Sequence, residues 1–130
     1  MKKIIRLFII ILFTSISFNS CSNDDDHNSV NEPIDKDVYY VKYTIKGNGA
    51  YGRFSNWSVT TPNGGYSNNG YQTTSWTQTY GPTKKGFNCN VNIKNYIYQK
   101  PTIEIHVSKN NEPFALKEIK NGTSASYTIK

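Results

Sequence analysis

The sequence predicts an all-β protein of about seven antiparallel strands, arranged as an immunoglobulin-like sandwich, with a small β-barrel as the alternative. Apolar residues recur with period two from Val38 onward, and no stretch keeps the i, i+3, i+4 spacing of an amphipathic helix over several turns. Ten tyrosines and nine glycines in 130 residues favour strands and turns over helices. Turn residues recur at roughly ten-residue intervals, which is typical of a two-sheet sandwich.

Each expected strand is bounded by glycine, asparagine or proline, which supply the backbone angles that turns require. The clearest strand is 87–94, where every odd position is apolar and every even position is polar. The expected strands are 38–46, 57–61, 71–80, 87–94, 102–108, a segment with Phe114 and Leu116, and a last segment with Ala125, Tyr127 and Ile129. The expected turns and loops include 47–49, 62–70, 81–82, 95–98, 110–111 and 121–122.

The alternation also predicts which side chains form the core. Cys89 lies among alternating apolar residues, so we expect it to be a small buried residue without a disulfide. The predicted core consists of Val41, Tyr43, Ile45, Trp57, Val59, Trp76, Phe87, Cys89, Val91, Ile93, Ile103, Ile105, Val107, Phe114, Leu116, Tyr127 and Ile129.

Residues 1–20 have the pattern of a secretion signal, with basic residues followed by an apolar run at 7–13. This run is shorter than the ~20 residues that a membrane-spanning helix needs. Residues 18–21 (Phe-Asn-Ser-Cys) resemble the lipobox of bacterial lipoproteins, in which the cysteine thiol is acylated and becomes the mature N-terminus. The resemblance implies that Cys21 carries a lipid, which anchors the protein to a membrane. The alternative is a plain signal peptide with a chance cysteine.

Residues 21–37 form an acidic tether, which we expect to be disordered, and residues 38–130 form the β-domain. Asp24, Asp25 and Asp26 follow closely behind Cys21 and resemble the export signal that sends certain lipoproteins to the outer face of the outer membrane. We therefore expect a lipid-anchored protein of the outer membrane, displayed at the cell surface. The alternatives are a solvated spacer and a location on the periplasmic face.

Charge differs sharply between the two parts. Residues 22–37 carry six acids and one lysine, a net charge of −5, whereas residues 38–130 carry eleven basic residues and three glutamates, a net charge of +8. A basic domain suits acidic envelope material, while nucleic acid is disfavoured because of the compartment and the scattered lysines. A lipid-anchored inhibitor of a host or competitor enzyme such as lysozyme is a less favoured alternative, because lysozyme is itself basic.

The sequence offers little for catalysis or metal binding. In the domain, Glu104, Glu112, Glu118 and His106 are the acids and the histidine, and Glu104 and His106 share one strand face. We interpret them as an ordinary surface pair, so the sequence predicts no enzyme, no cofactor and no metal site.

Aromatic and amide residues are in surplus, with fifteen aromatics among residues 38–130. Tyr51 and several other tyrosines fall in or beside expected loops, next to asparagines. A ring beside amides suits a sugar, because the ring covers the C–H face and the amides pair with hydroxyls. The simpler alternative is that Tyr and Asn suit exposed strands and turns. The predicted contact residues for a glycan or an envelope protein are Tyr66, Tyr71, Tyr96 and Tyr98.

The order of these patterns resembles a known family. The pattern comprises Tyr-x-Val-x-Tyr-x-Ile at 39–45, Trp76, Lys-Gly-Phe-x-Cys-x-Val-x-Ile at 85–93 and Thr-Ile-Glu-Ile-x-Val at 102–107. It is similar to that of small lipoprotein relatives of the MmpS type, which are membrane-tethered β-sandwich domains. The resemblance implies an accessory role beside RND-type transporters. The lipid anchor differs from the transmembrane helix of that family.

Overall fold

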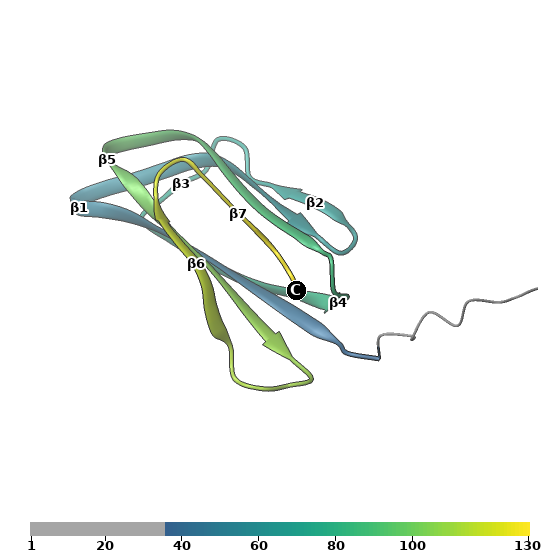
Figure 1. Cartoon of the computed structure of the whole chain (residues 1–130). Coiled ribbons are helices and arrows are strands. Elements are labelled where there is room, and N and C mark those ends of the chain that lie inside the picture. The colour runs from purple at the N-terminus through teal and green to yellow at the C-terminus, as the bar shows by residue number, and fades with distance from the viewer. Residues whose placement is uncertain (1–35) are drawn as a thin grey trace, which may run out of the picture. The chain divides into compact units, whose positions relative to one another are not determined.

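The computed structural model describes residues 36–130, which contain seven strands and no helix (Figure 1). The predicted all-β class is confirmed. The strands are β1 (Tyr39–Thr61), β2 (Gly64–Ser67), β3 (Gln72–Thr73), β4 (Ser75–Thr83), β5 (Asn88–Lys109), β6 (Ala115–Asn121) and β7 (Ser124–Thr128). Within this part of the chain, no helix is long and apolar enough to cross a membrane.

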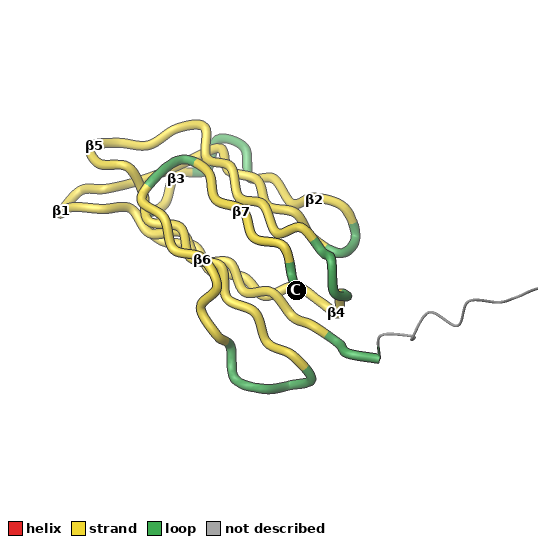
Figure 2. Tube along the Cα trace, in the orientation of Figure 1, coloured by secondary structure: helices red, strands yellow, loops and turns green. Residues whose placement is uncertain are grey.

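The long strands β1 and β5 form the backbone of the fold. They pair antiparallel from Tyr39↔Lys109 to Val59↔Val91, and each contributes to both halves of the sheet. The first half-sheet has β4 and β6 beside residues 39–46 of β1 and 102–109 of β5. The second half-sheet has β2, β3 and β7 beside the remaining parts of β1 and β5. The open sheet folds over at its middle, so that the two halves face each other as a sandwich (Figures 1 and 2).

The expected turn at 47–49 is wrong, because β1 continues through it as an irregular bend. The register shifts twice here, from Lys46 to Asn48 and from Asn48 to Arg53. A Cβ on Gly47 would clash with the backbone oxygen of Gly52, so only glycine allows this close approach. Because of the bend, β1 belongs to both half-sheets. Period-two alternation by itself predicts two separate strands here.

The same correction applies to the expected loop at 95–98, which lies within β5. β1 and β5 bend together, since Asn48 pairs with Gln99 and Arg53 pairs with Ile97 on either side of Tyr98. The segment at 64–67, expected as a loop, is the short strand β2. The expected strand 71–80 is divided between β3 and β4.

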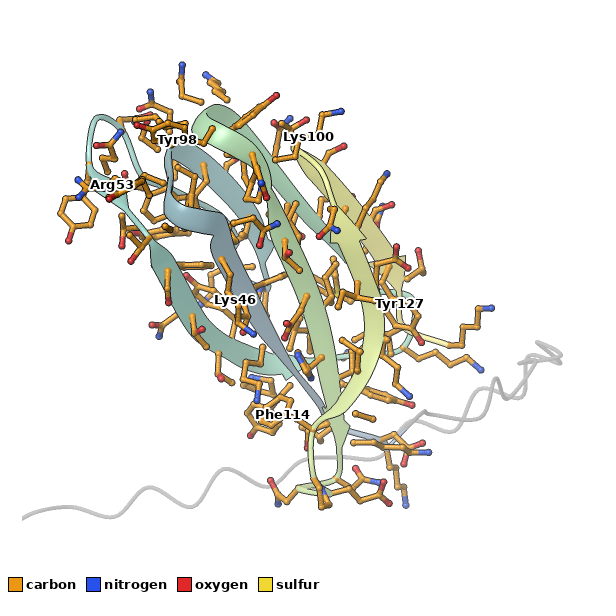
Figure 3. All side chains as sticks on the ribbon, turned by 90° about the vertical axis from the view of Figure 1, so that its left-hand side faces the viewer. Lys46, Arg53, Tyr98, Lys100, Phe114 and Tyr127 are labelled. Atoms are coloured by element: carbon orange, nitrogen blue, oxygen red, sulfur yellow. The ribbon has the colours of Figure 1, made fainter. Side chains whose placement is uncertain are left out.

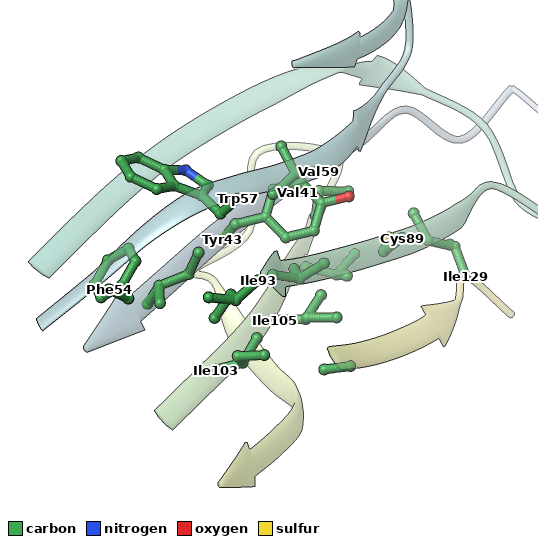
Figure 4. Packing of buried hydrophobic residues seen from close by; sticks show 14 of the residues in the cluster. Val41, Tyr43, Phe54, Trp57, Val59, Cys89, Ile93, Ile103, Ile105 and Ile129 are labelled. Carbon is green, nitrogen blue, oxygen red and sulfur yellow. The ribbon is translucent and has the colours of Figure 1, made fainter. Parts of the chain in front are cut away.

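The core lies between the two half-sheets and is drawn in Figure 4. The register places Tyr43 beside Ile105 in one half and Trp57 beside Ile93 in the other. Every residue of this buried cluster, taken among residues 36–130, falls between positions 39 and 129. The buried hydrophobic residues are Tyr39, Val41, Tyr43, Ile45, Phe54, Trp57, Val59, Cys89, Val91, Ile93, Ile103, Ile105, Val107, Ala125 and Ile129.

Most of the predicted core is confirmed, with Trp76, Phe87 and Tyr127 packed partly buried against it. Phe114 and Leu116 were predicted wrongly, because they remain 37% and 49% exposed. An irregularity in the β5–β6 ladder pairs Leu116 with His106, a position with polar neighbours. The centroid of the Phe114 ring lies 4.9 Å from Lys42 Nζ, so the ring is covered by a charged group. Both residues therefore lie outside the core.

Candidate functional site

Four segments meet where β1 and β5 bend, and together we call them the bend end: residues 47–56, 68–74, 95–101 and 121–124. Backbone hydrogen bonds join them, since Gly47 N donates to Thr74 O at 2.8 Å and Gly122 N donates to Pro101 O at 2.9 Å. Figure 3 shows Arg53, Tyr98 and Lys100 near this end, with Phe114 toward the other. The fold thus gathers side chains that are far apart in the sequence.

Two exposed tyrosines mark the bend end. Tyr51 from β1 and Tyr98 from β5 are 71% and 73% exposed, and their ring centroids are 6.1 Å apart with a tilt of 46°. Tyr98 has a φ of 69°, in the left-handed region that a bulky side chain rarely adopts. Such strain costs of order 1–3 kcal/mol and is concentrated at functional sites in proteins. The pair therefore combines high exposure with a backbone held in a rarely adopted conformation.

The bend itself is fixed by amide hydrogen bonds. Residues 49–52 of β1 lie opposite Tyr98 alone, which pushes Tyr51 out of the ladder toward the Tyr98 ring. Asn48 Nδ2 donates to the carbonyl of Lys100 at 2.8 Å and thereby holds β1 against β5 on the far side of Tyr98. The strained tyrosine is thus held in a defined position.

A second amide chain brings the β2–β3 loop to the same end. Asn56 Nδ2 donates to Asn95 Oδ1 at 2.8 Å, while Asn56 Oδ1 accepts the N–H of Gly70 at 2.6 Å. Tyr71, which is 64% exposed, precedes the short strand β3, and β3 pairs with β1 at Phe54, the residue that pairs with Tyr96 on β5. Asn56 itself has a φ of 53°, which asparagine tolerates better than most residues.

The chemistry of the bend end is aromatic, amide and basic. Its four segments contain Arg53 and Lys100 but no aspartate or glutamate. Exposed rings beside amides can hold the apolar face and the hydroxyls of a sugar. The absence of carboxylates from these segments also leaves the surface open to anionic groups.

The predicted contact residues are divided by the structure. Tyr71, Tyr96 and Tyr98 belong to the bend end, with Tyr96 39% exposed. Tyr66 lies elsewhere, because its ring stacks on Trp76 with centroids 5.6 Å apart and planes 9° from parallel. Trp76 in turn contacts the core through Trp57, so Tyr66 covers an edge of the sandwich.

Tyr51 is the contact candidate that sequence reasoning passed over, although its place among loop tyrosines was visible. Its signal was the pair of glycines, Gly49 and Gly52, on either side of it. Arg53 carried no signal of its own in the sequence, since only the pairing with Ile97 places it beside the bend of β5.

Glu104 and His106 touch, as their shared strand face predicts. Glu104 Oε2 lies 3.0 Å from His106 Nε2, and Glu104 Oε1 accepts from Lys46 Nζ at 2.8 Å. These hydrogen bonds, to Lys46 first and then to His106, lower the pKa of the Glu104 carboxyl below its ordinary value. A carboxylate with both oxygens engaged and a lowered pKa is a weak proton acceptor, so the group suits a surface network.

Cys89 is fully buried and free, as predicted for a small apolar residue. Burial raises the pKa of its thiol to about 11, which keeps it protonated at neutral pH. Burial likewise raises the pKa of the neighbouring Tyr43, whose hydroxyl donates to the carbonyl of Thr60 at 2.9 Å. Both residues belong to the core.

Residues 36–130 contain no group of three or more His, Cys, Asp or Glu side chains placed to hold a metal ion. The predicted lipid site Cys21 and the predicted export signal at Asp24, Asp25 and Asp26 lie outside the described residues. The lipid site and the export signal remain predictions from the sequence.

No family model matches the chain, and the comparisons with curated proteins and with solved structures return no match either.

Proposed function

We propose that this protein is a non-catalytic binding module, held by a lipid on Cys21 at the outer membrane and displayed at the cell surface, with the bend end as its contact surface. The contact surface is supported most by the Tyr51–Tyr98 pair. Both rings are highly exposed, and the backbone of Tyr98 has a φ of 69°. Exposed rings cost solvation free energy unless a partner covers them, and backbone strain persists only where its surroundings hold it.

Carbohydrate is the ligand class that the bend end supports best. Tyr51, Tyr71 and Tyr98 present rings at one end of the domain, and the exposed amide of Asn95, whose Oδ1 accepts from Asn56, has its Nδ2 group available for a hydroxyl. This combination matches the two faces of a sugar ring, one of C–H groups and one of hydroxyls. An accessory role beside an envelope transporter, as the MmpS-like strand pattern suggests, is the second candidate.

Binding of residues 36–130 to a glycan array tests the contact surface. We expect the separate changes Tyr51→Ala and Tyr98→Ala each to weaken glycan binding about tenfold or more, because stacked aromatic contacts contribute of order 1–3 kcal/mol. Ile119→Ala is the matched control, since Ile119 is 58% exposed on β6, outside the bend end. Equal losses in all three variants would contradict the assignment.

Two further outcomes decide between the candidates. Specific capture of a transporter subunit, lost in Tyr98→Ala, would support the accessory role over the glycan. Turnover of a polysaccharide or peptide substrate that disappears in His106→Ala or Glu104→Ala would contradict both binding roles.

The anchor and its location need separate measurements on whole cells. Labelling with a fatty-acid analogue should tag the protein, and Cys21→Ala should abolish both the label and membrane sedimentation. Protease added to intact cells should remove the domain, while replacing Asp24, Asp25 and Asp26 with Ala should protect it. Protection of the unmutated protein would place the domain on the periplasmic face.

A further inference from the structure

The end of the sandwich opposite the bend has a different chemistry, and we call it the tether end: residues 36–38, 62–63, 81–87, 109–114 and 129–130. The chain enters the domain here, as Figure 1 shows. Val38 N donates to Asn110 Oδ1 at 2.9 Å, and Asn110 N donates to Val38 O at 2.8 Å. The Asp37 carboxylate lies 2.6 Å from Lys109 Nζ. The point of entry is therefore fixed to the β5–β6 hairpin.

Three lysines surround this point of entry. Lys36 precedes it, and Lys84 and Lys85 lie in the connection between β4 and β5. That connection is itself tied down, since Gly86 N donates to the carbonyl of Ile129 at 2.8 Å and Ile129 N donates to the carbonyl of Phe87 at 3.0 Å. Among residues 36–130, no salt bridge engages any of the three lysines. Their ammonium groups are open to anions from outside the domain.

The three lysines line two adjoining hollows. One hollow of about 260 Å³ has Lys36 and Lys84 in its wall together with Val38, Pro82 and Asp37, whose carboxylate is paired with Lys109. The other, of about 350 Å³, has Lys84 and Lys85 with Pro82 and Phe87. Each hollow thus combines ammonium donors with apolar walls, and Lys84 belongs to both. Such a surface matches a layer of phosphate groups above glycerol and acyl chains.

We propose that the tether end is a docking surface for anionic lipid headgroups, with Lys36, Lys84 and Lys85 contacting the phosphates of the leaflet that holds the lipid on Cys21. The anchor in this statement rests on the proposed function, whereas the lysine surface does not. Fourteen residues separate Cys21 from Lys36 and, even fully extended, span at most about 50 Å, so a lipid on Cys21 would keep the domain near the bilayer and weak contacts would suffice to orient it. With the tether end against the membrane, the bend end and its tyrosines face outward.

Vesicle sedimentation of residues 36–130, which contain the buried cluster at 39–129, tests the surface without the anchor. We expect binding to vesicles of mixed phosphatidylglycerol and phosphatidylcholine, little binding to phosphatidylcholine alone, and release at high salt. Lys84→Gln with Lys85→Gln should lower the partition coefficient about 25-fold, since each lysine near an anionic surface contributes a factor of roughly five.

The matched control is Lys94→Gln with Lys120→Gln, which removes the same charge from exposed positions outside the tether end. We expect this control to change vesicle binding less than about twofold. Equal losses in both double variants would mean that net charge alone determines binding, which would overturn the proposal. Inorganic phosphate at matched ionic strength should not displace the domain. Displacement would assign the lysines to free phosphate and overturn the headgroup site.

A longer chain, residues 22–130, tests whether the lysines of the tether end bind the membrane or the acidic segment that precedes the domain. If Asp24, Asp25 and Asp26 covered the lysines, this chain would lose vesicle binding that residues 36–130 retain, which would overturn the proposal. Failure here is distinguishable from failure of the proposed function, because glycan binding at the bend end and sedimentation through Cys21 do not depend on Lys84 or Lys85.

Discussion

The two ends of the β1–β5 ribbon differ in both chemistry and construction. The bend end presents Tyr51 and Tyr98 among amides and contains no carboxylate, while the tether end presents lysines, prolines and an Asp37–Lys109 ion pair. Amide hydrogen bonds such as that from Asn56 to Asn95 hold the bend end, whereas the tether end holds the entering chain. One small sheet thus presents two surfaces of different chemistry at opposite ends of the β1–β5 ribbon.

Strain is a second difference between the ends. Tyr98 at the bend end has a φ of 69° in the middle of a strand, whereas at the tether end positive φ values fall on residues that tolerate them, such as Asn110 at 49° and Gly86 at 84°. Among residues 36–130, a bulky residue has a positive φ only at the end with the exposed rings. This is the pattern expected where a ring must be displayed in a fixed direction.

The largest expected effect concerns the bend itself. Gly47→Ala should destabilise the domain by about 3 kcal/mol, because its Cβ would collide with the backbone of Gly52. Gly122→Ala is the matched control, since its Cβ would make ordinary contacts with Lys120 side-chain atoms at 3.8 Å and the Ser124 carbonyl oxygen at 4.0 Å, and we expect a change within about 0.5 kcal/mol. Urea unfolding followed by tryptophan fluorescence measures both. Equal stability of the two variants would show that the bend is not held by this contact.

A smaller effect on the free energy of unfolding distinguishes a contact role of the Tyr98 ring from a role in holding the fold together. Tyr98→Gly should leave the free energy of unfolding unchanged within about 0.5 kcal/mol, because relief of the positive φ offsets the lost ring contact with Tyr51. Tyr96→Gly, at a position without positive φ, should cost about 1 kcal/mol or more. A large loss of stability in Tyr98→Gly would mean that the ring supports the fold and is not mainly a contact residue.

The smallest effect concerns the Lys46–Glu104–His106 network, which belongs to neither end. The lowered pKa of Glu104 in the folded state implies a stabilising contribution that is present above its unfolded pKa of about 4.3 and is lost as pH falls through the folded pKa. Glu104→Gln should therefore flatten the acid limb of a plot of stability against pH. Glu118→Gln controls for the loss of one carboxylate. An unchanged acid limb in Glu104→Gln would show that the network contributes no pH dependence.

Local alternation was enough to predict the strand class and most of the core. Residues such as Val91 and Ile93 alternate with asparagines, and period two leaves one face apolar in any sheet that they join. The errors at Phe114 and Leu116 have a tertiary cause, because a register shift in the β5–β6 ladder, set by pairing with another strand, decides which face Leu116 occupies.

The candidate contact surface was predicted only in part. Tyr71, Tyr96 and Tyr98 were chosen from local composition, and the structure brings them to one end. Tyr66 was chosen on the same grounds, yet it stacks on Trp76, a contact between strands that no local signal reports. Tyr51 joins the surface only because the bend of β1 turns it toward Tyr98.

By itself the sequence determined the all-β class, the apolar faces and the charge difference between residues 22–37 and 38–130, because these depend on residue type and short-range period. The tertiary structure decided that two long strands serve both layers, that Tyr51 meets Tyr98 at one end, and that Lys36, Lys84 and Lys85 lie at the other. Those features depend on register, bulges and the packing of one half-sheet on the other. They are long-range interactions, and a residue's immediate neighbours carry no record of them.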